Sequence, residues 1–286
     1  MTSTEVTMSV NKIGFVGAGK LARVLTVGFI RAGILSAKDI IASAPTERDV
    51  EAFRDIGCPV TTDNKTVLKE NPVIILAVKP QTLHSVVREI APLVTRDHLI
   101  ISPAAGITLR SIQNELPGRS RVARMMTNLA VEYREGATAF CQGRFMEEED
   151  YETMMYLFSS VGYCFETPEG LMDVMTGLVG GGPAYMYVAI EALADGAVEA
   201  GVNRQDAIQL AARAVSGAAK MVLGTKQHPG ELKDNVCSAG GSTIAGIFAL
   251  ERAGFRGALM EAVKASSERA KQVGVEAIKK GTYGGK

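Results

Sequence analysis

Short apolar runs alternate with helical patterns over the first 166 residues of the chain. The runs are continuous rather than alternating, as strands of a parallel sheet covered on both faces require. Between them, apolar residues recur at helical spacing, as in Leu21, Val24, Leu25 and Phe29. This alternation predicts an α/β fold with an N-terminal Rossmann-like doubly wound sheet. The apolar runs occupy residues 12–16, 39–42, 73–78, 99–102, 121–125, 138–141 and 163–166, with a weaker one at 59–61.

The pattern changes after residue 167, where strand signals stop and helical ones take over. We predict that residues 1–167 form a Rossmann dinucleotide-binding domain and residues 168–286 an all-helical dimerisation and substrate domain. The helix expected at 183–200 carries only three charges, Glu191, Asp195 and Glu199, on one narrow face. The helix after it is rich in small residues. Two nearly apolar helices in so small a domain need another surface to cover them, so we predict an obligate homodimer.

A glycine-rich turn links the first apolar run to the first helix. It reads Gly17, Ala18, Gly19, Lys20, Leu21, Ala22, which is the dinucleotide fingerprint between a strand and a helix. Gly17 permits the tight turn, and Gly19 lets the backbone approach a pyrophosphate at the helix N-terminus. A glycine-rich turn without a ligand is the competing interpretation. Small residues also follow the runs at 73–78 and 99–102, where a parallel sheet binds its ligand.

The residues after the second run bear on the choice between NADPH and NADH. An NAD site usually carries an acid at the end of the second strand, where it bonds the ribose 2′-hydroxyl. Ser43 stands at that end here, and Arg48 follows. Because a 2′-phosphate prefers donors and a cation, we expect NADPH, with NADH as the alternative. Glu47 as the missing acid, and Arg48 as an ordinary exposed residue, are the competing interpretations.

A second glycine-rich stretch lies late in the chain. Ser238, Ala239, Gly240, Gly241, Ser242 and Thr243 lead directly into an apolar helical pattern. A helix N-terminus offers unpaired N–H groups and a positive dipole end, so this stretch is suited to hold a small carboxylate. The Thr243 hydroxyl would then be free to contact the reacting atom. The alternative is that Ser238 or Ser242 merely caps the helix.

Composition narrows the classes of partner. Lys plus Arg equals Asp plus Glu, at 31 each, so no basic excess favours nucleic acid or an acidic membrane surface. No apolar run approaches the length of a membrane span, and the N-terminal residues resemble neither a secretory signal nor a transit peptide. The four cysteines form no close pair, which predicts free thiols, no metal site and a cytoplasmic location. We expect structural roles for His84, His98 and His228.

Eight segments run in order through nearly the whole chain: residues 14–21, 77–80, 104–106, 134–137, 177–185, 191–196, 228–236 and 240–244. Together they resemble the pyrroline-5-carboxylate reductase family. The late cluster at 240–244 is specific to that family, whereas the nucleotide motif is not. The resemblance implies hydride transfer from NADPH or NADH to the C=N carbon of 1-pyrroline-5-carboxylate, giving L-proline in the last step of proline biosynthesis. It also implies a helical dimerisation domain, and dimers often assemble into rings in this family.

The resemblance also implies roles for individual residues. Thr243 would be the catalytic residue that hydrogen-bonds the ring nitrogen. The substrate carboxylate would be held by Ser238, Gly240, Gly241 and Ser242. The dinucleotide would be lined by Val16, Gly17, Ala18, Gly19, Lys20, Leu21, Ser43, Asn64, Ala77, Val78, Lys79, Pro80, Ala104, Ala105 and Gly106.

Six positions depart from the pattern of the family. Val179 and Gly181 stand where serine is usual, and Ala239 precedes the double glycine in place of proline. Thr127 also replaces a common proline, and Leu129 and Ala130 stand where threonine and proline are frequent. These changes leave Thr243 and both neighbouring glycines intact. They bear instead on the side-chain contacts of the glycine-rich joint and of the cofactor loop.

Two other functions fit part of the sequence. A β-hydroxyacid dehydrogenase would use a lysine as acid and base, and Lys233 or Lys220 could be offered, although neither has the expected spacing from the glycines at 180–182. Activity on hydroxy acids would favour that class. A dinucleotide-sensing protein would bind NADPH without turnover, but it has no need of a second, carboxylate-shaped site.

Overall fold

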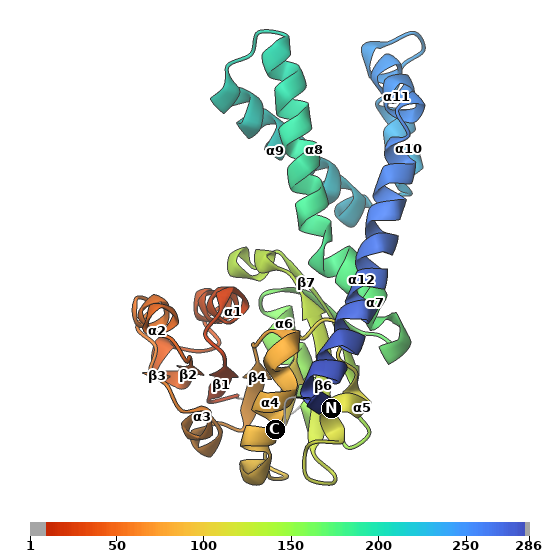
Figure 1. Cartoon of the computed structure of the whole chain (residues 1–286). Coiled ribbons are helices and arrows are strands. Elements are labelled where there is room, and N and C mark those ends of the chain that lie inside the picture. The colour runs from red at the N-terminus through yellow and green to blue at the C-terminus, as the bar shows by residue number, and fades with distance from the viewer. Residues whose placement is uncertain (1–9, 284–286) are drawn as a thin grey trace, which may run out of the picture. The chain divides into compact units, whose positions relative to one another are not determined.

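The computed structural model describes residues 10–283, and the side chains of residues 47–49 and 280–283 lie outside that description. The chain separates into two compact units, which are described one at a time. Unit 1 comprises Met1–Gly180 and Ser266–Lys286, and unit 2 comprises Gly181–Ala265. The long final helix therefore contributes to both units (Figure 1). The division that the sequence suggests between residues 167 and 168 stays a prediction.

Unit 1 is built on one eight-stranded sheet with the order β3-β2-β1-β4-β5-β6-β7-β8. Neighbouring strands pair in parallel from β3 to β6, as crossover connections through helices require. This confirms the predicted Rossmann-like sheet. The strands are β1 Ile13–Val16, β2 Ile40–Ser43, β3 Val60–Thr61, β4 Val73–Leu76, β5 Leu99–Ser102, β6 Arg121–Thr127, β7 Gly136–Gln142 and β8 Gly162–Glu166.

The last two strands reverse direction. β7 pairs with β6 antiparallel and with β8 in parallel. Only residues 128–135 connect β6 to β7, and they include the short 3-10 helix η3 (Leu129–Tyr133). A parallel crossover needs a dozen or more residues, so this connection is too short for one. The sequence pattern located both strands but gave no orientation for them.

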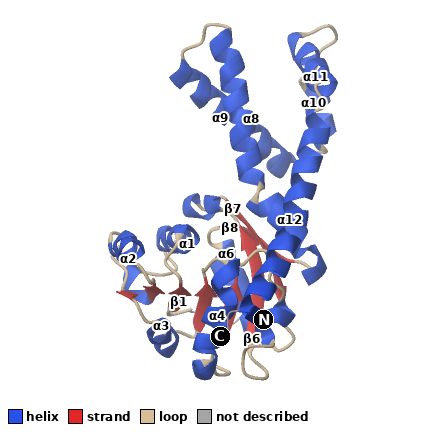
Figure 2. Cartoon of the chain, in the orientation of Figure 1, coloured by secondary structure: helices blue, strands red, loops and turns tan. Residues whose placement is uncertain are grey.

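Helices cover both faces of the sheet (Figure 2). On one face, Phe15 and Ile75 pack with α1 and α6 residues such as Phe29 and Phe158. On the other face, Ile74 and the neighbouring strand residues of the same parity pack with α3, α4 and α5. The period of two along each strand thus divides the core into two layers. The unit 1 helices are α1 Lys20–Arg31, α2 Glu47–Arg54, α3 Asn64–Glu70, α4 Pro80–Ile90, α5 Leu109–Gln113, α6 Glu148–Ser159 and α7 Met172–Met175.

Unit 2 is entirely helical within its described residues, as the sequence predicts. Its helices are α8 Gly182–Glu199, α9 Arg204–Thr225, α10 Pro229–Asn235, α11 Ser242–Arg252 and the first part of α12 Phe255–Tyr283. α8 and α9 pack on each other through the small side chains of Ala194, Ala207 and Ala211. These three alanines are the buried hydrophobic residues of this unit among those described.

Candidate functional site

The predicted cofactor residues gather at the carboxyl edge of the sheet in unit 1. β1 ends at Val16, β2 at Ser43, β4 at Leu76 and β5 at Ser102. Parallel pairing brings these four strand ends to one edge, so the segments that follow β1, β4 and β5 leave from the same place. Ligands of open α/β sheets bind there. The segments are residues 17–21, 77–80 and 104–106.

The glycine-rich turn has the backbone that the fingerprint requires. Gly17 has φ +102°, a conformation that favours glycine, and a Cβ on it would lie 2.6 Å from the Ala77 carbonyl oxygen. A Cβ on Gly19 would meet only that same oxygen, at 3.9 Å, so the backbone is open there. Gly17 therefore serves the turn, and Gly19 leaves room for a ligand to approach.

Two helix N-termini at this edge have no side-chain cap. Gly19 is the N-cap of α1 and Lys79 is the N-cap of α4, and neither helix has a side-chain hydrogen bond at its cap. Lys20 and Lys79 are exposed. Free N–H donors, the positive dipole ends and two lysines form a donor set that suits a doubly charged pyrophosphate. The residues present therefore fit the dinucleotide that the fingerprint predicts.

Ser43 does not present a free hydroxyl to a ligand. Its side chain is 1% exposed and donates to Asn64 Oδ1 at 2.6 Å. Its oxygen also lies 3.4 Å from the Gly17 nitrogen, whose main acceptor is the Ser43 carbonyl at 3.0 Å. In this arrangement the Ser43 proton is engaged by Asn64, and the role expected for Ser43 in binding a 2′-phosphate stays a prediction. The side chain of Arg48, the other basis for expecting NADPH, lies outside the described residues.

Asn64 connects this edge to a residue that sequence reasoning missed. Its Nδ2 donates to Glu89 Oε2 of α4 at 3.1 Å. Glu89 lies on the exposed side of an ordinary amphipathic helix, and nothing in the local pattern distinguishes it from its neighbours. The contact spans 25 positions in sequence, so only the fold shows it.

Gly106 has a packing function as well as its predicted place beside the cofactor. It has φ +76°, and a Cβ on it would lie 2.0 Å from the Ala270 carbonyl oxygen. Gly274 has the reciprocal restriction, since its Cβ would lie 2.0 Å from the Gly106 carbonyl oxygen. The two glycines therefore let the loop after β5 touch the backbone of α12 within unit 1.

Two of the positions that depart from the family pattern are accommodated inside unit 1. Thr127 is buried, and its hydroxyl donates to the Ala137 carbonyl at 3.0 Å. Val179 is buried in a π-helical turn, Thr176–Gly180, and its carbonyl accepts from Asn128 Nδ2 at 3.3 Å. π-turns are frequent at functional sites. The valine thus packs in the core, while the turn is held through the backbone.

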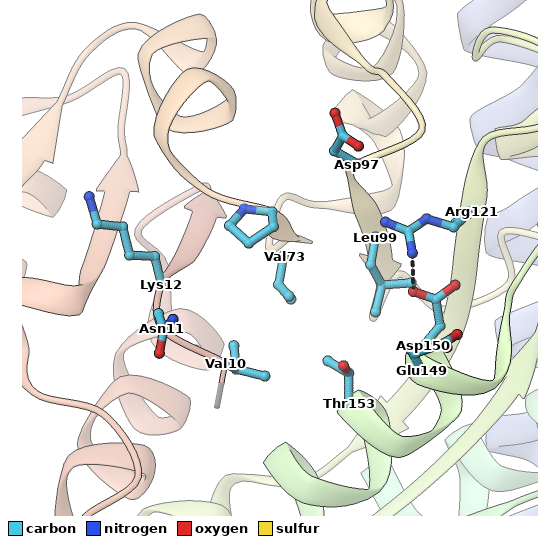
Figure 3. Close-up of a pocket in the computed structure, with 11 residues that line it drawn as sticks. Val10, Asn11, Lys12, Val73, Asp97, Leu99, Arg121, Glu149, Asp150 and Thr153 are labelled. Carbon is cyan, nitrogen blue, oxygen red and sulfur yellow. Dashed lines mark hydrogen bonds and ion pairs between the residues drawn. The ribbon is translucent and has the colours of Figure 1, made fainter. Parts of the chain in front are cut away.

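A cavity of about 340 Å³ lies at the opposite, amino edge of the sheet (Figure 3). It is lined by residues at the starts of β1, β4, β5 and β6 and on α6, and its wall includes an ion pair of 2.9 Å between Arg121 and Asp150. Burial raises the pKa of Asp150, against the opposing effects of its hydrogen bond from the Glu147 backbone and of Arg121. Because parallel sheets bind dinucleotides at their carboxyl edge, this cavity is not the cofactor site.

The predicted substrate residues lie together in unit 2, at the start of α11. Residues 238–241 form a turn in which the Gly241 N–H donates to the Ser238 carbonyl at 3.0 Å and Gly240 has φ +68°. A Cβ on Gly241 would lie 2.4 Å from Ser238 Oγ, so a side chain there would displace the Ser238 hydroxyl. Ser242 and Thr243 are the first two residues of α11, and both are exposed.

Neither serine caps α11, which answers the simpler interpretation of this stretch. The N-cap residue is Gly241, and it makes no side-chain cap hydrogen bond. The first helical bond runs from Ala245 N to the Gly241 carbonyl, at 3.3 Å. The backbone N–H groups of residues 242–244 are therefore available to an anion, with the Thr243 hydroxyl beside them.

Lys233, one of the two lysines offered for rival chemistry, and the three histidines have partners within the protein. Lys233 pairs with Asp234, and the hydrogen bond from that carboxylate raises the pKa of Lys233, which keeps the ammonium protonated and unsuited to act as a base. His84 lies buried between Glu115 and Ser111, at 2.8 and 3.3 Å. His98 bonds the Leu68 carbonyl, and His228 caps α10. Each histidine thus has a hydrogen-bond partner within the protein, and the structural roles expected for them stay a prediction.

Two kinds of feature are not found among residues 10–283. No group of three His, Cys, Asp or Glu side chains within the described residues could hold a metal ion. Within the same range, each helix is too short or too polar to cross a membrane.

The fold and its two sites define an NAD(P)H-dependent oxidoreductase with an α/β cofactor unit and a helical unit. Residues 12–106 match a family model described as NADP oxidoreductase coenzyme F420-dependent. Residues 169–273 match the model for pyrroline-5-carboxylate reductase dimerisation. A pyrroline-5-carboxylate reductase of Methanosarcina acetivorans is 46% identical over 93% of this chain and 99% of its own length. The chain belongs to the pyrroline-5-carboxylate reductase family.

Other similar proteins extend this comparison. Human pyrroline-5-carboxylate reductase 2 is 46% identical over 91% of this chain and 83% of its own length. Among solved structures, a pyrroline carboxylate reductase of Plasmodium falciparum with NADP bound has a TM-score of 0.86 at 28% identity, covering 93% of this chain and 99% of that one. A pyrroline-5-carboxylate reductase of Coxiella burnetii has a TM-score of 0.82 at 30% identity, covering 92% and 98%.

Proposed function

We propose that this protein reduces 1-pyrroline-5-carboxylate to L-proline, the last step of proline biosynthesis, in the cytoplasm. The observation that carries the proposal is the uncapped N-terminus of α11 with Thr243 in its first turn. A family resemblance in the nucleotide motif alone would fit many oxidoreductases. A reductase of a small cyclic imino acid also needs a second site that can hold the substrate carboxylate, and the start of α11 in unit 2 has the free N–H donors for it.

The substrate carboxylate would be held by backbone. Gly240, Gly241 and Ser242 carry the chain through the turn into α11, and the N–H groups at the helix start favour an anion by both hydrogen bonding and the helix dipole. Ser238 adds a hydroxyl on the same turn. An anchor of this kind fixes the orientation of the ring, and orientation is a large part of the barrier that such an enzyme lowers.

The Thr243 hydroxyl would form a hydrogen bond with the ring nitrogen. A cyclic imine is easily protonated, and the iminium accepts hydride readily, so a neutral hydroxyl suffices where reduction of a ketone would want a histidine or a lysine. Bound NADPH, with NADH as the alternative, supplies the hydride to the C=N carbon. The nitrogen keeps its proton and becomes the secondary amine of proline. In unit 1 the dinucleotide would be held by residues 16–21, 77–80 and 104–106, together with Ser43 and Asn64.

We further propose that the active form is an obligate homodimer, and that dimers can assemble into a ring. The support is in unit 2, where large apolar side chains are exposed around α8, α9 and α11 while the buried hydrophobic residues described there are three alanines. Surfaces of this kind mark association sites.

The test is NADPH oxidation with 1-pyrroline-5-carboxylate as substrate, with NADH run in parallel. Thr243→Val keeps the β-branched shape but removes the hydroxyl, and Thr243→Ser keeps the hydroxyl. We expect kcat/KM to fall by about tenfold or more in Thr243→Val, at least about 1.4 kcal/mol of transition-state stabilisation, and to stay within about threefold of wild type in Thr243→Ser. Tight NADPH binding without turnover of the wild-type protein would contradict the proposed reaction.

A further inference from the structure

A chain of hydrogen bonds runs from the end of β2 to the surface of α4. Ser43 Oγ donates to Asn64 Oδ1 at 2.6 Å, and Asn64 Nδ2 donates to Glu89 Oε2 at 3.1 Å. Ser43 is the last residue of β2, the position that contacts the ribose 2′ group in dinucleotide folds. Glu89 belongs to none of the motifs, so its part in this site is visible only through Asn64.

The carboxylate of Glu89 fixes which group donates and which accepts in each of these hydrogen bonds. A carboxylate accepts hydrogen bonds and donates none, so the Asn64 side chain must turn its NH₂ group toward Glu89. Its carbonyl oxygen then faces Ser43. Ser43 has a single hydroxyl proton and two candidate acceptors, Asn64 Oδ1 at 2.6 Å and the Phe15 carbonyl at 3.4 Å. The shorter bond takes the proton.

The donor and acceptor order of these hydrogen bonds decides which groups of Ser43, Asn64 and Glu89 remain available to a cofactor. The Ser43 proton is engaged by Asn64, and Glu89 engages an N–H of Asn64. What remains at Ser43 and at the Asn64 carbonyl is oxygen lone pairs, and Glu89 adds a negative charge nearby. A ribose 2′-hydroxyl can donate to such acceptors. A 2′-phosphate accepts only and is itself strongly negative, so at Ser43, Asn64 and Glu89 it meets neither a free donor nor a favourable charge.

We propose that Glu89 is a specificity-determining residue that lowers the preference of this site for NADPH relative to NADH. The proposal rests on the dinucleotide-dependent reductase function above. Glu89 acts through Asn64 and is a positioning residue. Replacing Glu89 by glutamine removes its charge and lets the side chain donate as well as accept. The Asn64 amide can then reverse, which turns an N–H toward Ser43 and frees the Ser43 proton.

The test is a fluorescence titration of wild type and Glu89→Gln with NADPH and with NADH, which needs no substrate. We expect the ratio Kd(NADH)/Kd(NADPH) to rise by about fivefold in Glu89→Gln, the scale of a partly exposed charged contact. Glu70→Gln is the matched control, because Glu70 is an exposed glutamate at the other end of α3. In this control the ratio should stay within about twofold of wild type.

Three outcomes would overturn the proposal: an unchanged ratio in Glu89→Gln, equal weakening of both cofactors, or the same shift in Glu70→Gln. The second would show a merely structural role, and the third a general effect of charge. Asn64→Asp provides an independent check, since it replaces the reversible amide by a second acceptor-only group and should lower the ratio. A wild-type protein that binds both cofactors but reduces no cyclic imine would contradict the proposed reaction and leave this ratio measurable.

Discussion

Units 1 and 2 differ in how much of their apolar side-chain surface they bury within the single chain. Unit 1 buries two layers of aliphatic and aromatic residues against its sheet, and buried polar groups such as Ser43 and Thr127 have partners inside it. Unit 2 buries three alanines and leaves large apolar residues such as Tyr187, Leu223 and Phe248 exposed. About 0.8 kcal/mol per buried CH₂ is the usual gain on burial, so unit 2 gains little from its own core. We therefore expect the stability of unit 2 to depend on association with a second copy.

The largest expected difference between the two units is in the reactivity of their cysteine thiols. Cys58, Cys141 and Cys164 are buried in unit 1, whereas Cys237 is partly exposed in unit 2, next to the turn at residues 238–241 that we propose holds the substrate. Burial raises the pKa of Cys58 to about 11 and that of Cys141 and Cys164 to about 12, so these thiols are neutral and covered at pH 8. We expect a thiol reagent to label one cysteine quickly in the native protein and the other three only on unfolding.

Two results would check the assignment of the fast thiol. Cys237→Ser should have no fast phase at all, and a fast phase that persists would show that unit 1 opens readily.

The raised pKa values of the three buried thiols also predict that the stability of unit 1 depends on pH. The folded state keeps its thiol protons after the unfolded chain, with an ordinary pKa near 9.0, has lost them. Unfolding therefore releases protons, and the stability of unit 1 should fall as the pH rises from about 9 toward 11.

The next largest effect should be on assembly. Phe248 on α11 and Tyr163 on β8 are almost equally exposed in the single chain, at 68% and 69%. If unit 2 is covered by a second copy, Phe248→Glu places an uncompensated charge in that interface, and we expect the dimer to weaken by about 100-fold or more. Tyr163→Glu should leave assembly unchanged. Light scattering after gel filtration measures both, and a stable Phe248→Glu dimer would place the interface elsewhere.

The sequence predicted the features that depend on neighbouring residues. The strand runs, the turn at Gly17 and Gly19, and the helix start at Thr243 all follow from local pattern. What it missed is non-local. The reversal of β7 depends on the length of one connection, and the Ser43–Asn64–Glu89 chain depends on three elements meeting. The partner of the Ser43 hydroxyl could not be predicted for the same reason, because Asn64 lies 21 positions away.

The smallest and sharpest contrast uses one substitution, glycine to alanine, in each unit. Gly274 of α12 lies against the Gly106 backbone, where a Cβ would approach to 2.0 Å, so Gly274→Ala must push the loop and the helix apart. We expect unit 1 to lose about 1–3 kcal/mol of unfolding free energy. Gly217, inside α9, would place its Cβ in open space within the single chain. Gly217→Ala should therefore stabilise α9 by about 0.5–1 kcal/mol through helix propensity alone.

Denaturant unfolding of the two variants would show which surface of α9 the second copy covers. A gain in Gly217→Ala means that this face of α9 stays open in the dimer, so the interface involves other surfaces such as that around Phe248. A loss, together with weaker association, means that a partner helix approaches the α9 backbone closely at Gly217, as helices rich in small residues allow. A loss without any change in association would contradict the open space seen around Gly217 in the single chain. It would also undermine the contrast between a self-sufficient unit 1 and a unit 2 that depends on its partner.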